Sequence, residues 1–174
     1  GVEGRYARHL RDVSQIIGKK PGVLDFSGLS LLISQRGATF FTDTYVTIDP
    51  TAEEVAEMTI MASAEIRRFG ITPRAALVSH SNFGSRESEG ASKMRRAMEL
   101  VREQDPTLEA DGEMHGDAAI SEVLRQRVMP DSTLTGEANL LVFPNLDAAN
   151  ITLGVVKTMT DSLHVGPILL GAAL

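Results

Sequence analysis

The stretch Asn139-Leu-Leu-Val-Phe143, which runs through Pro144 into Asn145-Leu-Asp147, decides the fold class of this chain. Its first five residues form the most apolar strand-like segment of the sequence. A strand of this kind is typical of the centre of a sheet that is covered on both faces. Asn145 and Asp147 are good helix caps, so a helix is expected to begin there and to continue to Met159. The stretch therefore predicts a buried strand that leads directly into a helix.

The same alternation of strands and helices extends along the chain in both directions. Further strands are expected at residues 28–34, 38–47, 74–79, 108–114 and 166–171. Further helices are expected at residues 5–17, 51–69, 91–101 and 117–128. From Pro50 onward the connections are short, which indicates a largely parallel sheet with right-handed crossovers. The sequence therefore predicts a single α/β domain over residues 1–174.

The first two expected strands are joined only by Gln35-Arg36-Gly37. A short connection with a glycine near its end is typical of a β-hairpin. We therefore expect an antiparallel pair that lies at an edge of the sheet or projects as an arm. The predicted fold class is thus α/β, with a mostly parallel sheet, flanking helices and an antiparallel hairpin.

Two of the expected helices begin with a capping signal. Thr51 and Glu54 have the spacing of a capping box, in which each side chain accepts a hydrogen bond from the backbone N–H of the other residue. Asp117 stands directly before Ala118-Ala119, where an acidic residue is a good N-cap. Both positions are predicted to start a helix.

Composition excludes several classes of function. The net charge of −6 comes without a basic block, which argues against a nucleic-acid partner. The chain has no cysteine, so disulfides, thiolate metal sites and cysteine nucleophiles are excluded. No apolar run approaches the roughly 18 residues that span a membrane. The first residues also lack the charged segment followed by an apolar segment that is typical of a signal peptide. We therefore expect a cytoplasmic protein without a membrane partner.

The loop Ser79-His-Ser-Asn-Phe-Gly-Ser85 is the strongest candidate for a ligand site. It follows an expected strand, is rich in hydroxyl and amide groups, and lies just before an expected helix start. Backbone N–H groups and the helix dipole at such a place favour a phosphate, and the guanidinium that follows would add charge-assisted hydrogen bonds. The alternative is a solvated loop with a turn at residues 82–84. The candidate ligand residues are Ser79, Ser81, Asn82, Gly84, Ser85 and Arg86.

The run from Asp111 to Asp117 is a second candidate site, because Asp111, Glu113, His115 and Asp117 would share one face of an extended segment. Imidazole and carboxylates in this arrangement suit a divalent metal or general acid–base chemistry. The structural alternative is a turn, a polar niche for His115 and a helix cap at Asp117. No second histidine lies nearby in sequence, so neither a metal site nor a catalytic residue is assigned.

Asn145 heads a third polar group, which also contains Asp147 and Asn150. Helix capping explains most of this group, although contact with a ligand at the end of a strand is also open. No segment matches the glycine pattern of a dinucleotide-binding site, so no cofactor is expected within this chain.

Three segments of the sequence resemble the phosphate acetyl/butyryltransferase family. They are residues 111–119, residues 136–151 and Gly166-Pro-Ile-Leu-Leu-Gly171. Together with the loop at residues 79–85, they are most similar to one branch of that family. This branch is the phosphotransacetylase-like C-terminal region of bacterial NADP-dependent malic enzymes. The resemblance runs from about Arg5 to the last residue.

The resemblance implies an isocitrate-dehydrogenase-like α/β architecture in which this chain is mainly the second of two domains. Phosphotransacetylases move an acetyl group between coenzyme A and phosphate and usually form dimers. In the malic enzymes, the equivalent region is thought to bind acetyl-CoA and to regulate malate decarboxylation without catalysis of its own. The parent enzyme would use NADP and a divalent metal. The resemblance therefore implies acetyl-CoA as an effector and a homo-oligomer of two or more chains.

Two departures from the enzyme pattern indicate that this segment is inactive by itself. Leu169-Leu170 stands where phosphotransacetylases have Cys-Gln. The essential Ser-Arg pair and an acid of those enzymes would come after Leu174, so the chain is expected to be a fragment of a longer one. The resemblance carries a ligand-binding role only to Asp117 and to the loop at residues 79–85.

We therefore predict a regulatory, acetyl-CoA-sensing and oligomerisation domain of a malic enzyme. The alternative is a phosphate acetyltransferase that has been cut short. Two further hypotheses are a metal-dependent hydrolase centred on His115 and a purely structural dimerisation domain.

Overall fold

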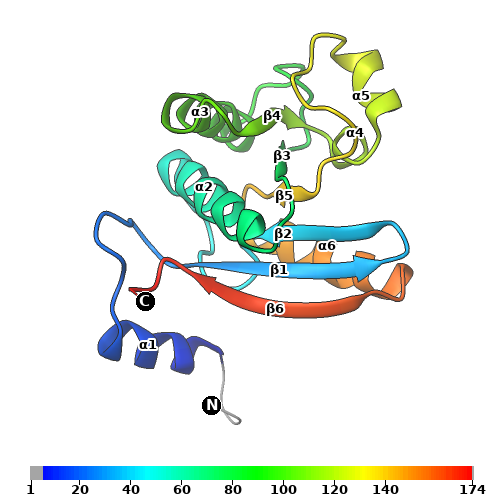
Figure 1. Cartoon of the computed structure of the whole chain (residues 1–174). Coiled ribbons are helices and arrows are strands. Elements are labelled where there is room, and N and C mark those ends of the chain that lie inside the picture. The colour runs from blue at the N-terminus through cyan, green and yellow to red at the C-terminus, as the bar shows by residue number, and fades with distance from the viewer. Residues whose placement is uncertain (1–5, 174) are drawn as a thin grey trace.

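The structure is a computed structural model that describes residues 6–173. The predicted helix start at Arg5 lies outside the described residues. The chain forms one six-stranded sheet with helices on both faces (Figure 1). The strands are β1 Ser27–Ser34, β2 Gly37–Thr42, β3 Arg74–Val78, β4 Glu109–Met114, β5 Leu140–Val142 and β6 Leu163–Leu170. The helices are α1 Tyr6–Ile16, α2 Ala52–Arg68, α3 Glu89–Gln104, α4 Gly116–Ala119, α5 Glu122–Val128 and α6 Leu146–Met159.

The sheet order β4-β3-β5-β2-β1-β6 combines parallel and antiparallel strands. β3 pairs in parallel with both β4 and β5, and β5 pairs in parallel with β2. β5 is therefore an interior strand, and its three residues are all buried, as its apolar composition predicts. The predicted fold class, an α/β sheet with flanking helices and an antiparallel hairpin, is confirmed.

The hairpin does not have the predicted position at an edge or on an arm. β1 and β2 pair as expected, from Ser34 with Gly37 to Ser30 with Phe41. However, β2 continues into the parallel part of the sheet, and β6 pairs antiparallel along the other side of β1. β6 starts at Leu163, three residues before the predicted start of that strand, and it forms the edge in place of the hairpin.

β2 is also shorter than predicted, because the chain turns at Asp43. The buried Asp43 carboxylate accepts hydrogen bonds from the backbone N–H groups of Tyr45, Val46 and Thr47, at 2.8–3.1 Å. These N–H groups are therefore used in a turn and do not continue the ladder. The strand ends at Thr42, and residues 43–47 lead the chain out of the sheet towards α2.

Alternate residues of the central strands divide the core into two layers. Phe40, Leu77 and Leu140 face α2 and α3, whereas Phe41, Val78 and Leu141 face α4 and α6. Figure 1 shows α2 in front of β1 and β2, and α6 behind them. The two-residue period of the strands thus produces a three-layer α/β/α arrangement.

The predicted caps of α2 and α6 are confirmed. Glu54 N donates to Thr51 Oγ1 at 3.2 Å, and Thr51 N donates to Glu54 Oε2 at 2.7 Å, which is the reciprocal capping box. Asn145 caps α6 through a hydrogen bond from Ala148 N. Ser88 caps α3 in the same way. These polar side chains set the points at which three helices begin.

The helix predicted at residues 117–128 is instead two short helices, α4 and α5. Ser121 interrupts it, because its side chain accepts from Leu124 N and so starts a new helix. Asp117 is not an N-cap, because α4 already begins at Gly116 and His115 holds the cap position. The Asp117 carboxylate accepts from the neighbouring Ala118 N at 2.7 Å. The predicted N-cap, Asp117, therefore lies two residues after the observed N-cap, His115.

Candidate functional site

The carboxyl ends of β3 and β5 open into a cavity of about 520 Å³ that we call the crevice. Three of its lining residues are the N-caps of three different helices, namely Thr51 of α2, Ser88 of α3 and Asn145 of α6. Open α/β sheets bind ligands outside the carboxyl ends of their strands. The crevice is therefore the candidate site for a small molecule. Its other lining residues are Asp49, Pro50, Ser79, His80, Glu89, Gly90, Lys93 and Pro144.

The crevice offers hydrogen-bond donors to an anion, and two acids, Asp49 and Glu89, line it as well. Each helix N-terminus presents backbone N–H groups and the positive end of a helix dipole. Lys93 adds a cation whose side chain is only 17% exposed, and its ammonium lies 2.6 Å from the Asp49 carboxylate. Asp49 is 76% exposed and can turn to water, which would leave the Lys93 charge for a ligand. The crevice therefore has the donor groups that a phosphate or a carboxylate requires.

Two of the predicted ligand residues, Ser79 and Asn145, line the crevice. They follow β3 and β5, which are adjacent in the sheet, so the parallel pairing brings them to the same edge. His80, which belongs to the candidate loop but is not among the selected side chains, and Lys93, which sequence reasoning did not select, also line the crevice. A signal for Lys93 exists in the sequence, because it lies within the first five residues of α3, close to the cap at Ser88.

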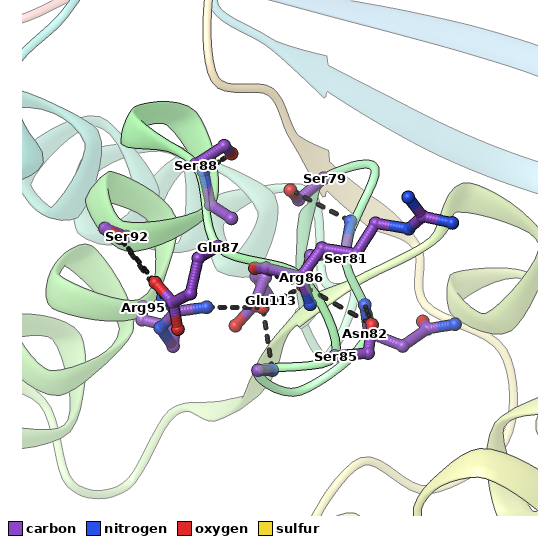
Figure 2. A network of polar contacts seen from close by, with 12 residues as sticks. Ser79, Ser81, Asn82, Ser85, Arg86, Glu87, Ser88, Ser92, Arg95 and Glu113 are labelled. Atoms are coloured by element: carbon purple, nitrogen blue, oxygen red, sulfur yellow. Dashed lines mark hydrogen bonds and ion pairs between the residues drawn. The ribbon is translucent and has the colours of Figure 1, made fainter.

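The rest of the predicted loop is organised around a buried carboxylate, that of Glu113 in β4. Glu113 Oε1 accepts from Ser81 Oγ at 2.7 Å, from Gly84 N at 2.9 Å and from Arg95 Nη1 at 3.0 Å. Figure 2 shows these contacts converging on Glu113 from the loop and from α3. A hydroxyl, a backbone N–H and a guanidinium would also suit a phosphate oxygen. Here the protein supplies its own anion to these donors.

The other predicted ligand residues of the loop have structural partners as well. Asn82 Oδ1 accepts from His115 N at 2.7 Å, and Ser85 Oγ accepts from Asn82 N at 2.9 Å. The backbone N–H of Arg86 donates to Ser81 Oγ, while its side chain extends away from Glu113 (Figure 2). Asp117 lies on α4 and is not among the residues that line the crevice. The structure therefore brings Ser79 and Asn145 together and leaves the remaining candidates outside the crevice.

The side chains of Asp111, Glu113, His115 and Asp117 do not form one site. Only Asp111 and Glu113 belong to β4, and each is paired with an arginine of α3. Arg102 Nη2 lies 2.9 Å from Asp111 Oδ1. Arg95 forms the second ion pair between α3 and β4, with Glu113. Within residues 6–173, no three histidine or acidic side chains are placed so that they could hold a metal ion.

Sequence reasoning missed this double pairing, although its signal is visible in the sequence. Two arginines seven positions apart lie on one face of a helix, and two acids two positions apart lie on one face of a strand. A helix that packs beside this strand brings the two pairs into register. The match becomes recognisable only when α3 is known to pack against β4.

The hydroxyl groups that line the crevice are engaged in capping and turn contacts. Ser79 Oγ accepts from Ser81 N, Ser88 Oγ from Ala91 N, and Thr51 Oγ1 from Glu54 N. Nucleophilic catalysis instead requires a hydroxyl that is bonded to a general base. These contacts give the three hydroxyl groups structural roles, as two helix caps and in one turn.

Comparisons with known proteins agree with this architecture. The sequence matches the family described as phosphate acetyl/butaryl transferase over residues 1–174. It is 84% identical over its full length to a malic enzyme of Rhizobium meliloti that is named NAD-dependent. It is also 49% identical, over 99% of this chain, to the NADP-dependent malic enzyme of Escherichia coli. The chain spans 23% of the length of each of these two relatives.

A solved phosphotransacetylase has the same fold. The crystal structure from Streptococcus pyogenes aligns with 99% of this chain at a TM-score of 0.92 and 33% sequence identity. The chain covers 53% of that protein. Within the described part of the chain, none of the helices has the length and hydropathy that crossing a membrane requires. The match over the whole sequence and the shared fold lead to one conclusion: this chain belongs to the phosphate acetyl/butaryl transferase family.

Proposed function

We propose that this chain is the regulatory, acetyl-CoA-sensing domain of a malic enzyme, and that the crevice receives a phosphate-bearing part of the effector. The observation that carries this proposal is the convergence of three capped helix N-termini with Lys93 in one cavity. Coenzyme A is rich in phosphate groups, which helix N-termini and a partly buried ammonium bind well. The similarity to the malic enzymes supports the parent activity that we propose, the oxidative decarboxylation of malate to pyruvate.

The role that we propose for the domain is binding without chemistry. The hydroxyls of Thr51, Ser79 and Ser88 accept hydrogen bonds from backbone N–H groups at two helix starts and a turn, which supports a structural role for them. Regulation then requires that acetyl-CoA bind two quaternary states of the enzyme with different affinities. The parent would be a cytoplasmic enzyme that supplies its own NADP site and divalent metal. The relatives include both NAD-dependent and NADP-dependent enzymes, so NADP remains a prediction.

The test is malate turnover by the malic enzyme that contains this region, measured with increasing acetyl-CoA. We expect turnover to change saturably, and Lys93→Met to require about tenfold more acetyl-CoA because a charge-assisted contact is lost. Lys20→Met is the matched control, because Lys20 is an exposed lysine outside the crevice. Turnover that is indifferent to saturating acetyl-CoA would refute the proposal.

The alternative function is a phosphate acetyltransferase, which the phosphotransacetylase relatives favour. An assay of acetyl phosphate formation from acetyl-CoA and phosphate, on the same enzyme, separates the two functions. A robust rate would favour the acetyltransferase, whereas a regulatory domain should form no acetyl phosphate.

We also propose that the domain forms a homo-oligomer through the outer face of α6. Ile151, Val155 and Met159 follow one another at helical spacing and are 64%, 51% and 80% exposed. Leu163 and Val165 of the edge strand β6 are exposed as well. Exposed apolar side chains at such spacing are typical of an interface, and most homo-oligomers use the same surface on each subunit.

A further inference from the structure

A second cavity, with a volume of about 280 Å³, lies at the end of the sheet opposite the crevice. Its lining includes Ala38, Arg74 and Asn139, which stand at the amino ends of β2, β3 and β5. The turn between β1 and β2 also borders it, so we call it the hairpin pocket. Figure 1 shows this turn at the end of the sheet where β6 begins. Among the described residues, none lines both cavities, so the hairpin pocket and the crevice are separate sites.

The floor of the hairpin pocket is apolar and fixed. Leu32, Phe41 and Leu141 belong to its lining and come from the neighbouring strands β1, β2 and β5. All three side chains are buried in the core layer between the sheet and α6. Close packing in a core holds such side chains in place, so the floor keeps its shape when a ligand enters.

The walls of the hairpin pocket are apolar side chains that solvent still reaches. Ile120, at the end of α4, is 38% exposed, and Val156 of α6 is partly buried. Neither residue belongs to the outer stripe of α6 that we propose as an interface, although Met159 of that stripe borders the pocket as well. A ligand that covers these walls removes apolar surface from water, so the pocket favours a carbon chain.

Three charged residues line the hairpin pocket, namely Arg36, Arg74 and Glu137. Arg36 Nη2 lies 2.8 Å from Glu137 Oε1, so these two residues form an ion pair. Asp161 follows the lining residue Thr160, but it is exposed and lies outside the lining. The lining therefore carries one cation more than it carries anions.

Arg74 is the cation without a carboxylate partner. Within residues 6–173, no carboxylate oxygen lies at ion-pair distance from its guanidinium. Its Nε donates to the main-chain carbonyl of Glu137 at 2.8 Å, and its backbone N donates to Asn139 Oδ1 at 2.7 Å. Both partners line the pocket, so these contacts hold the guanidinium beside the lining while its two Nη groups stay available to a ligand.

The chemistry of this cation selects a carboxylate. A planar guanidinium with two available N–H edges matches the two oxygens of a carboxylate and forms charge-assisted hydrogen bonds with them. An organic ammonium ion would meet the excess positive charge of the lining instead. The polar group of the ligand is therefore expected to be an anion.

The volume of the hairpin pocket limits the length of the ligand. Sites for small molecules usually have volumes of about 300–1,000 Å³. At about 280 Å³, the hairpin pocket lies at the lower end of this range. It therefore suits a short carbon chain rather than a long acyl chain.

From these observations we propose that the hairpin pocket is a binding site for a short aliphatic monocarboxylate. The carboxylate of the ligand pairs with the guanidinium of Arg74. Its carbon chain lies between Ile120 and Val156, above the apolar floor. This site is independent of the acetyl-CoA site proposed above.

The experiment is isothermal titration calorimetry of hexanoate into the full-length enzyme that contains this chain, at neutral pH. Hexanamide has the same carbon chain without the charge, and acetate has the same charge without the chain. We expect one hexanoate to bind per chain, and both control compounds to bind at least about tenfold more weakly. Absence of hexanoate binding, or equal binding of hexanoate and either control compound, would overturn the proposal.

Variants locate the binding energy within the hairpin pocket. Arg74→Met removes the guanidinium and should weaken hexanoate at least about tenfold. Arg127→Met is its matched control, because it removes an exposed arginine of α5 that lies outside the pocket. Hexanoate that binds equally to these two variants would be bound elsewhere, and the proposal would fail.

Because Arg74 also donates to the main chain, Ile120→Ser provides a second variant that leaves the charges in place. It removes part of an apolar wall and should weaken hexanoate about threefold. Val123→Ser, which replaces an exposed apolar residue of α5 outside the pocket, should bind hexanoate like the unaltered protein. Equal affinities of the two serine variants would show that the carbon chain does not lie in the hairpin pocket.

Discussion

Arg125 is a cation enclosed by the protein in the middle of α5. Its side chain is fully buried, and its guanidinium donates to three main-chain carbonyls, those of Ala118, Leu134 and Gly136, at 2.6–3.0 Å. These carbonyls belong to the end of α4 and to the segment that leads into β5. The Arg125 side chain therefore links α4 to the segment before β5, two parts of the chain that do not pair as strands.

Replacement of Arg125 by methionine should be strongly destabilising. Methionine fills similar space but donates no hydrogen bond, so two buried carbonyls and one partly buried carbonyl would lose their donor. We expect the free energy of unfolding to fall by about 3 kcal/mol. Urea denaturation measures this loss, and Arg127→Met, an exposed arginine of the same helix, is the control. Equal losses for the two variants would contradict the anchoring role of Arg125.

His164 gives the stability of the domain a dependence on pH. Burial on β6 lowers the pKa of the His164 imidazole, and the nearby charge of Lys157 lowers it further. As the pH falls below the ordinary histidine pKa of about 6.5, the unfolded chain takes up this proton more readily than the folded chain. The contribution of His164 is therefore destabilising at acidic pH and absent at neutral pH.

We accordingly expect His164→Gln to reduce the loss of stability between about pH 7.5 and about pH 5. Urea denaturation at the two pH values measures the loss for each protein. His80→Gln, which replaces an exposed histidine, is the control variant. An unchanged pH dependence in His164→Gln would show that its imidazole does not carry the effect.

At the level of elements, β4 packs so closely against β3 that its central residue must be glycine. A Cβ atom on Gly112 would lie 2.6 Å from the carbonyl oxygen of Leu77, and the φ of Gly112 is +146°. Side chains rarely adopt this conformation, and the carbonyl belongs to the backbone of the next strand, which cannot easily move. The close approach also places Asp111 and Glu113, on either side of Gly112, opposite the arginines of α3.

Gly112→Ala should therefore destabilise the domain by about 2 kcal/mol or more. The contrasting variant is Gly154→Ala in α6, where the added methyl group meets no atom within 4 Å. Alanine is a better helix former than glycine, so this change should stabilise the domain by about 1 kcal/mol. Thermal or urea unfolding of both variants measures the two effects. If both substitutions changed the stability of the domain in the same direction, the close approach at Gly112 would not explain the loss.

At the scale of the whole molecule, we expect the protein to self-associate through the apolar face of α6. Val155→Lys places a charge at the centre of the stripe formed by Ile151, Val155 and Met159, where burial in an interface would be costly. We expect self-association to weaken by at least about tenfold, as measured by sedimentation equilibrium. Gln104→Lys adds the same charge at an exposed position at the end of α3 and should leave association unchanged. A monomeric parent protein would refute the interface itself.

The sequence by itself determined the strand and helix order, the apolar centre of the sheet at β5, and the caps at Thr51 and Asn145. These features depend on neighbours within three or four positions, or on the periodicity of one segment, so they can be recognised locally. The resemblance to a known family came from short motifs in the same way. Where one local signal competed with another, as at Asp117 and Ser121, the prediction of the helix boundary was wrong.

Only the tertiary structure decided the place of the hairpin and the composition of the two pockets. β6 pairs with β1 across 130 or more positions of the sequence, which no local pattern in either strand indicates. Glu113 and Ser81 are 32 positions apart, and Glu113 and Arg95 are 18 apart. A buried carboxylate takes whichever donors the packing of α3 and the loop at residues 79–86 brings to it. For that reason a loop whose sequence suggested a phosphate site proved to be closed around an acid of the protein itself, while the crevice beside it was formed where three helices begin.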